Sequence, residues 1–111
     1  MIRVKITAND VSTVAKVVLI DESERVLFLK RSDYVHRFAG EWDLPGGHLK
    51  ANESLEAGLE REVKEETGIP IRDPKFLLQM ENLHFFYAPY ESSPVVLSHE
   101  HVDFKFFDKI F

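Results

Sequence analysis

Cysteine is absent from the 111 residues of this chain. Disulfide bonds and metal sites built on thiolates are therefore excluded. No apolar run approaches the roughly 20 residues that a membrane-spanning helix needs. Residues 1–10 alternate charged and apolar side chains and lack the apolar centre of a signal peptide. We therefore expect a cytoplasmic protein.

An excess of positive charge is also lacking. The chain has 14 Lys and Arg residues and 19 Asp and Glu residues, which gives a net charge of -5. A broad DNA-binding face would be basic, so nucleic acid is not the expected partner, although a capped RNA 5′ end stays open. Small anionic substrates are not excluded, since a metal ion can reverse the local sign of a carboxylate-rich site. The length and the 44% hydrophobic content suit one domain over residues 1–111.

Most of the sequence is typical of β-strands. Apolar and charged residues alternate over residues 2–6, and further strand-like runs cover residues 14–20, 26–30, 42–44, 76–80, 83–88, 95–97 and 102–107. Residues 45–47, Pro-Gly-Gly, are expected to break the chain. Residues 53–67 have a helical period and end at Gly68. One helix among so many strands predicts a mixed α/β (α+β) domain built on a sheet.

The predicted helix carries a group of carboxylates on and beside its apolar stripe. At about 100° per residue, Glu62, Glu65 and Glu66 span an arc of about 100°, and Glu66 shares the angle of Leu55 and Leu59. Carboxylates this close repel one another, and a divalent cation relieves that repulsion. Hard oxygen ligands favour Mg²⁺ or Mn²⁺. The pattern therefore indicates a metal site.

Three further residues of the helix bear on this interpretation. Gly58 falls between two of these glutamates in angle, where it would leave room for ions and phosphates, and a mid-helix glycine costs about 1 kcal/mol. The alternative is that a charge-rich helix is merely a solvated face. That alternative explains the exposed positions Glu56 and Glu60 well, and it explains Glu66 poorly.

Residues 47–69 resemble the Nudix box, G-x5-E-x7-R-E-U-x-E-E-x-G-U, where U is aliphatic. A match by chance at one starting position has a probability on the order of 10⁻⁸ for this composition. The lead-in at residues 42–46 is also similar to that of the family, and Asn52 replaces a frequent glycine at little cost, because Asn tolerates positive φ. Every fixed position is filled, by Gly47, Glu53, Arg61, Glu62, Val63, Glu65, Glu66, Gly68 and Ile69.

The resemblance implies a Nudix fold, with the box forming a loop, a helix and a second loop against a mixed sheet. It implies that Arg61 pairs with a box glutamate, that Glu53 orients the metal shell, and that Glu62 is a ligand or the general base. The implied ligands of Mg²⁺ or Mn²⁺ are Gly46 (carbonyl), Glu62, Glu65 and Glu66. The implied reaction is attack of a metal-activated water on phosphorus, which cleaves a diphosphate linkage.

The chain departs from many Nudix proteins at its carboxyl end. Those proteins carry a helix after the last strand, whereas this sequence stops at Phe111, soon after Phe104, Phe106 and Phe107. The C-terminal helix is therefore expected to be missing or truncated. An apolar sheet face without that cover favours a homodimer.

Outside the box, the resemblance indicates five more candidates, of which Tyr87 is treated last. Glu100 would be an extra ligand or base, or else an ordinary loop carboxylate. Lys30 and Arg31 would contact substrate phosphates, which suits guanidinium geometry, or else be surface charges. Arg37, in the loop of residues 32–41, is a weaker candidate of the same kind. His99 and His101 receive no role.

Tyr87 lies 18 residues after Ile69, about where similar diadenosine polyphosphate hydrolases carry a tyrosine. The alternative is a core position beside two phenylalanines. The substrate classes that fit are nucleoside triphosphates, diadenosine polyphosphates, and ADP-ribose or nucleotide sugars. The alternative function is a non-catalytic Nudix-fold module that binds nucleotides or regulates. Such modules usually lose box glutamates, and this chain keeps them.

Overall fold

A computed structural model describes residues 13–33 and 38–108 of the chain. The strand predicted at residues 2–6 and the candidate Arg37 lie outside these ranges. Within them, seven strands accompany one helix: β1 (Val14–Ile20), β2 (Val26–Arg31), β3 (Trp42–Asp43), β4 (Gly46–His48), α1 (Leu55–Thr67), β5 (Lys75–Met80), β6 (Leu83–Pro89) and β7 (His101–Phe107). No described helix is long and apolar enough to cross a membrane.

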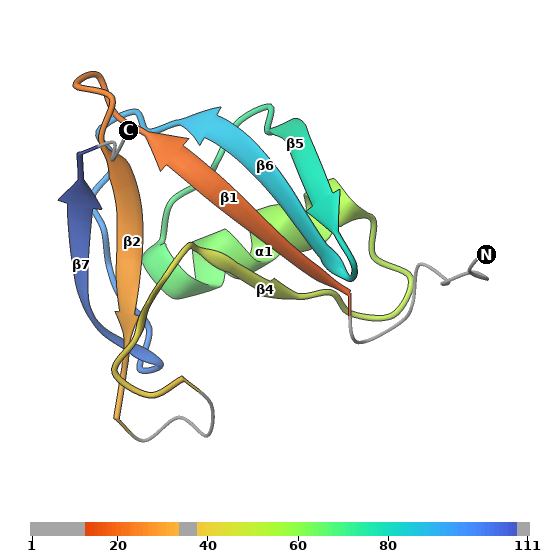
Figure 1. Cartoon of the computed structure of the whole chain (residues 1–111), viewed down its shortest axis with the longest axis horizontal. Helices are drawn as coiled ribbons and strands as arrows, with labels where there is room; N and C mark the ends of the chain where they lie inside the picture. The colour runs from red at the N-terminus through yellow and green to blue at the C-terminus, as the bar shows by residue number, and fades with distance from the viewer. Residues whose placement is uncertain (1–12, 34–37, 109–111) are drawn as a thin grey trace.

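The strands form one mixed sheet whose central path runs β3-β2-β1-β6-β5. β1 and β6 are parallel, while β1 with β2, β1 with β4, β2 with β3, β2 with β7, and β5 with β6 are antiparallel. Figure 1 shows β1, β6 and β5 side by side, with β2 and β7 at the other end of the sheet. The predicted mixed sheet is confirmed.

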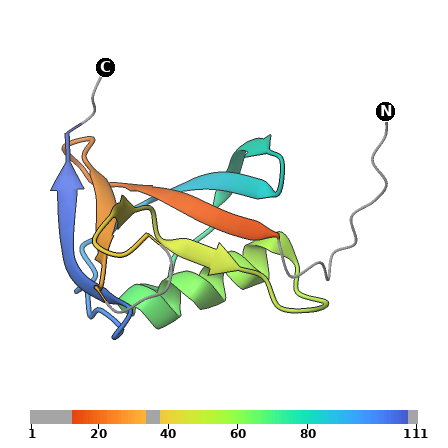
Figure 2. The ribbon, with the colours of Figure 1, turned by 60° about the horizontal axis from the view of Figure 1, so that its bottom comes forward.

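The helix packs against one face of this sheet, as predicted. β1 alternates strictly on that side, since Ala15, Val17 and Leu19 are fully buried, and Leu59 and Val63 of α1 belong to the same core cluster. Figure 2 shows α1 running beneath the strands. Burial of an apolar stripe of a helix against an apolar strand face is what makes this two-layer arrangement stable.

The other face of β5 and β6 is open. The β5–β6 register places Tyr87 opposite Lys75 and Phe85 opposite Leu78, on the face away from buried Phe86. Leu78 is 42% exposed, Met80 59% and Tyr87 42%. The alternative of a core position for Tyr87 is therefore wrong, because the alternation of a strand turns it away from the core.

Two local predictions fail for identifiable reasons. Residues 95–97 are not a strand. Residues 46–48, where a break was expected, form β4 and pair with β1. Gly46 has φ 126°, and a Cβ there would stand 2.1 Å from the Ala15 carbonyl oxygen. Glycine therefore permits this strand, because its backbone must approach β1 more closely than any side chain allows.

The helix begins two residues later than predicted. Ser54 caps it, because its hydroxyl accepts a hydrogen bond from the Ala57 N–H at 3.1 Å. Glu53 therefore lies in the loop before the helix, and its carboxylate accepts hydrogen bonds from Arg61 of the helix. Gly68, in a left-handed conformation with φ 75°, ends the helix as predicted.

Candidate active site

The two glycines of β4 bring the chain against the box glutamates. The Gly46 N–H donates a hydrogen bond to Glu66 Oε1 at 2.9 Å. A Cβ at Gly47 would lie 2.6 Å from Glu62 Oε1. The absence of side chains on β4 therefore lets two carboxylates of α1 reach the strand backbone.

Glu66 is the most deeply placed of these carboxylates. Its residue is only 7% exposed, and burial raises its pKa to about 8, against the lowering effects of the Gly46 N–H and of Lys16. Burial also raises the pKa of Glu62, while Arg61 acts to lower it. Charging either group in this environment is unfavourable unless a cation accompanies it.

Arg61 ties the box glutamates together. Its guanidinium donates to Glu53 at 2.6 and 3.0 Å, to Glu62 Oε2 at 3.2 Å and to Glu65 Oε1 at 3.1 Å. It also donates to the His48 carbonyl at 3.2 Å. The hydrogen bonds from Arg61 hold the pKa of Glu53 down at about 2. A planar fork of five donors can satisfy several acceptors at once, which Lys could not do.

The expected ligands share one region but are not closed around a central point. Within residues 13–33 and 38–108, no three acidic or histidine side chains gather as a group that could hold an ion. Arg61 accounts for this arrangement, because it bonds both Glu62 and Glu65, and the Glu65 side chain is 56% exposed. The Arg61 guanidinium thus compensates the charge of Glu62 and Glu65, and the Lys16 ammonium acts on Glu66.

Gly58 does not leave open space for ions, so that expectation is wrong. The residue is buried, and a Cβ on it would lie 2.8 Å from Leu49 Cγ and 3.0 Å from Glu53 Oε1. The loop before the helix folds over this position and fills the space. Glycine is needed here for the packing of that loop, which positions Glu53.

Lys16 is a member of the site that the sequence analysis missed. Its ammonium donates to Asp43 Oδ2 at 2.9 Å, to the Leu44 carbonyl at 3.2 Å and to the Gly46 carbonyl at 3.2 Å. Its side chain is only 14% exposed. A lysine inside a run of buried strand residues was the available signal, because a buried ammonium must find partners.

The remaining candidates divide into two groups. Glu100 is exposed, and its charge acts to raise the pKa of both Glu62 and Glu66, so it lies near the box. In the β2–β7 register, Lys30 lies opposite Asp103 and Arg31 lies opposite His101. The structure therefore brings Glu100 toward the box helix and leaves Lys30 and Arg31 at the end of β2.

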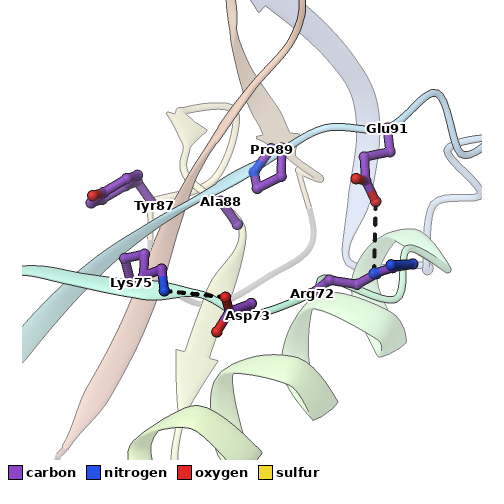
Figure 3. A pocket seen from close by; sticks show the side chains of 7 residues that line it. All are labelled: Arg72, Asp73, Lys75, Tyr87, Ala88, Pro89 and Glu91. Carbon is purple, nitrogen blue, oxygen red and sulfur yellow. Dashed lines mark ion pairs between the residues drawn. The ribbon is translucent and has the colours of Figure 1, made fainter.

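Tyr87 lies elsewhere, in a separate open pocket of about 370 Å³. Figure 3 shows its lining on β5, β6, the loop before β5 and the segment after β6, and no box residue takes part. The cations there are compensated, since Arg72 faces Glu91 at 4.0 Å and Lys75 faces Asp73 at 3.1 Å. The structure does not bring Tyr87 together with the box glutamates.

Comparisons with known proteins agree with this architecture. The NUDIX domain family model matches residues 11–109. An ADP-ribose pyrophosphatase of Methanocaldococcus jannaschii is 37% identical over 51 residues, which are 46% of this chain and 29% of that protein. An 8-oxo-dGDP phosphatase of Homo sapiens is 35% identical over 73 residues, which are 66% of this chain and 22% of that protein.

The chain thus spans about a third or less of the length of the curated relatives it matches. Among solved structures, the MutT protein of Methanosarcina mazei Go1 superimposes with a TM-score of 0.69 at 31% identity, over 86% of this chain and 75% of that one. A family model that matches nearly every residue is decisive here. This chain belongs to the Nudix domain family.

Proposed function

We propose that this protein hydrolyses a diphosphate linkage in a nucleoside diphosphate derivative, with Mg²⁺ or Mn²⁺ held by the box glutamates. The observation that carries the proposal is Glu66, a buried carboxylate with a pKa of about 8, hydrogen-bonded to the N–H of Gly46. A buried acid with a strongly raised pKa, near other carboxylates, is typical of a functional site.

The oxygen atoms around Glu66 are suitable ligands for a hard divalent cation. Glu62, Glu65 and Glu66 offer carboxylate oxygens and Gly46 offers a carbonyl, which are the ligands that Mg²⁺ and Mn²⁺ prefer. All four of these groups now have other partners. Arg61 donates to Glu62 and Glu65, the Gly46 N–H donates to Glu66, and Lys16 donates to the Gly46 carbonyl. A bound cation would supply an activated water and neutralise charge on the departing phosphate.

The other residues of the box have supporting roles in this proposal. Glu53 holds the Arg61 guanidinium in place, and Arg61 in turn holds Glu62. Glu62, with a raised pKa, is one candidate to accept the proton of the attacking water, and Glu100 is the other. The pKa shift of Glu62 favours it, because a general base works best when its pKa approaches the working pH.

Substrate contacts are proposed for the basic residues of the hairpin. Arg31 and Lys30 would bind phosphate oxygens, with Arg37 as a further contact from the neighbouring loop. Tyr87 would contact substrate only if the substrate has a second arm long enough to reach the pocket of Figure 3; among the three classes, the diadenosine polyphosphates carry a second nucleoside as such an arm.

The comparisons support the class of linkage rather than one substrate. The names of the two curated relatives, an ADP-ribose pyrophosphatase and an 8-oxo-dGDP phosphatase, share a nucleoside diphosphate. We therefore keep three substrate classes: nucleoside triphosphates, including damaged ones; diadenosine polyphosphates; and ADP-ribose or nucleotide sugars. Action on these small molecules in the cytoplasm is part of the proposal.

A panel of these substrates, each with Mg²⁺ and with Mn²⁺, tests the proposal by release of nucleotide products. The control is Glu66→Gln, which keeps an oxygen to accept the Gly46 N–H but removes the charge. We expect turnover of one class, reduced at least 100-fold in the variant. Binding of nucleotides by both proteins without turnover of any member would instead establish the non-catalytic module.

A further inference from the structure

The Lys16 ammonium lies among oxygen atoms of the segment that leads from β3 into β4. Lys16 is opposite Gly46 in the β1–β4 register, and it donates to the Gly46 carbonyl at 3.2 Å. It also donates to the Leu44 carbonyl at 3.2 Å and to Asp43 Oδ2 at 2.9 Å. The Lys16 side chain is only 14% exposed. Carbonyl and carboxylate oxygens are also the ligands of a hard metal ion, so Lys16 occupies acceptors of the kind that a metal uses.

Gly46 connects Lys16 with the carboxylates of the box. Its carbonyl accepts a hydrogen bond from Lys16, while its N–H donates one to Glu66 Oε1 at 2.9 Å. Burial raises the pKa of Glu66, and the charge of Lys16 acts in the opposite direction. The ammonium therefore interacts with one carbonyl and one carboxylate that the proposed function assigns to the metal.

An ammonium and a divalent cation that approach the same carbonyl oxygen repel each other. In a site with little exposed surface this repulsion is screened weakly. If Glu66 releases a proton when the metal binds, the net positive charge of the site still rises, because two charges replace one. Lys16 opposes that rise, and it keeps Asp43 and the Leu44 carbonyl as partners when it loses the Gly46 carbonyl.

We propose that Lys16 competes with the divalent cation for the Gly46 carbonyl, so that it weakens metal binding while it stabilises the metal-free fold. The inference rests on the proposed function, because it concerns the regulation of the same metal site. It explains why a lysine stands within a strand whose neighbours Ala15 and Val17 are fully buried. Occupancy of the site then follows the free metal concentration instead of being complete at all times.

The experiment measures the binding of Mn²⁺ alone to the whole chain at pH 7, from the electron paramagnetic resonance signal of the free ion. Lys16→Met removes the charge and keeps an unbranched side chain, so we expect its dissociation constant to be about tenfold lower than that of the original protein. Lys16→Arg retains the charge and should stay within about threefold of the original protein. Lys16→Gln is a second neutral variant that keeps N–H donors, and it should also bind Mn²⁺ more tightly.

Lys75→Met is the matched control. Lys75 is also an ion-paired lysine of a strand, because its ammonium lies 3.1 Å from Asp73 Oδ2. It lines the pocket of Figure 3, in which no box residue takes part. The variant changes the net charge of the chain as Lys16→Met does, and it should bind Mn²⁺ as the original protein does, since solvent screens distant charges.

The melting temperature in EDTA separates competition from a purely structural role. Lys16→Met leaves two carbonyls and Asp43 without their donor, so its melting temperature should fall by about 5 °C. Competition predicts opposite signs, with a less stable metal-free fold and tighter metal binding. A lysine that only supports the fold would lower both quantities. Unchanged or weaker Mn²⁺ binding in both neutral variants would overturn the inference.

The outcomes for Lys16 and for the proposed function remain distinct. Metal-dependent turnover together with equal Mn²⁺ affinity in Lys16→Met, Lys16→Gln and the original protein would refute the role of Lys16 alone. Tighter Mn²⁺ binding in the neutral variants without turnover of any substrate would refute hydrolysis and leave the competition supported. Absence of Mn²⁺ binding in every protein would refute both.

Discussion

At the scale of single residues, Glu66 ties stability to pH. Its pKa is raised from 4.5 to about 8 in the folded chain, so the folded state holds a proton that the unfolded state has released. This contribution to stability is fully present below the unfolded pKa and is lost as pH rises through about 8. Between pH 5 and pH 8.5, we expect the free energy of unfolding of the metal-free original protein to fall by more than that of the metal-free Glu66→Gln variant.

Thermal unfolding in EDTA at several pH values measures that difference. Other titrating groups contribute to both proteins, so the gap between the two curves isolates Glu66. Addition of Mg²⁺ should raise the melting temperature of the original protein most at high pH, where the carboxylate is ionised, and should hardly affect the variant. Parallel curves in EDTA would show that Glu66 titrates normally.

Arg61 gives a second prediction at this scale. Arg61→Lys keeps a charge but loses the fork that serves Glu53, Glu62 and Glu65, so we expect a loss of about 2 kcal/mol in the free energy of unfolding at pH 7. The lowered pKa of Glu53 contributes stability above 4.5 that is lost as pH falls through about 2. The deficit of the variant should therefore shrink in acid.

Urea unfolding at pH 7 and near pH 2.5 checks this prediction. Glu53→Gln and the double variant complete a mutant cycle, in which the coupling energy should account for most of the loss. Full additivity of the two single changes would mean that the Arg61–Glu53 pair, at 2.6 Å, does not stabilise the fold.

At the scale of elements, Gly58 sets how the box loop packs on α1. Alanine has the higher helix propensity, by about 1 kcal/mol, but its Cβ would meet Leu49 Cγ at 2.8 Å. Overpacking of this kind costs about 1–3 kcal/mol, so we expect Gly58→Ala to be destabilising despite the propensity. Ala57→Gly, at the exposed neighbouring position, measures the propensity effect alone. A stabilised Gly58→Ala protein would contradict this account of the loop.

The elements also show which sequence signals were sufficient. The strands at residues 14–20 and 26–31 and the helix up to Gly68 follow from local periodicity and a glycine stop. β4 does not, because Pro-Gly-Gly is locally a turn signal, and its pairing depends on the approach of Gly46 to Ala15, far away in sequence. The β-bulge at Val102 of β7 has no local signal either, since it depends on the register with β2.

At the scale of the whole molecule, the exposed face of β5 and β6 is a second candidate surface for a homodimer, besides the phenylalanine-rich carboxyl end on which the sequence-based expectation rests. Leu78, Met80 and Tyr87 are each more than 40% exposed on this face, and β5 is the last strand on its side of the sheet. Apolar edge strands associate readily. We expect a mass above that of one chain, increasing with concentration, in light scattering after gel filtration.

Leu78→Lys should shift that mass to a single chain without loss of melting temperature. Gln79→Lys is the matched control, because it adds the same charge to the same strand on its other face. A single-chain mass for the original protein at all concentrations, or equal effects of the two lysines, would exclude dimerisation through this face.

The sequence by itself determined the family, the mixed sheet with one helix, and the identity of the box residues. These follow from the spacing of charged and apolar residues along one helix and from side chains whose chemistry is local. Only the tertiary structure decided that Lys16 belongs to the site, that Leu49 occupies the space beside Gly58, and that Tyr87 faces away from the box. It also decided that His101 points inward. Each of these depends on contacts or strand registers between segments distant in sequence, which no local pattern encodes.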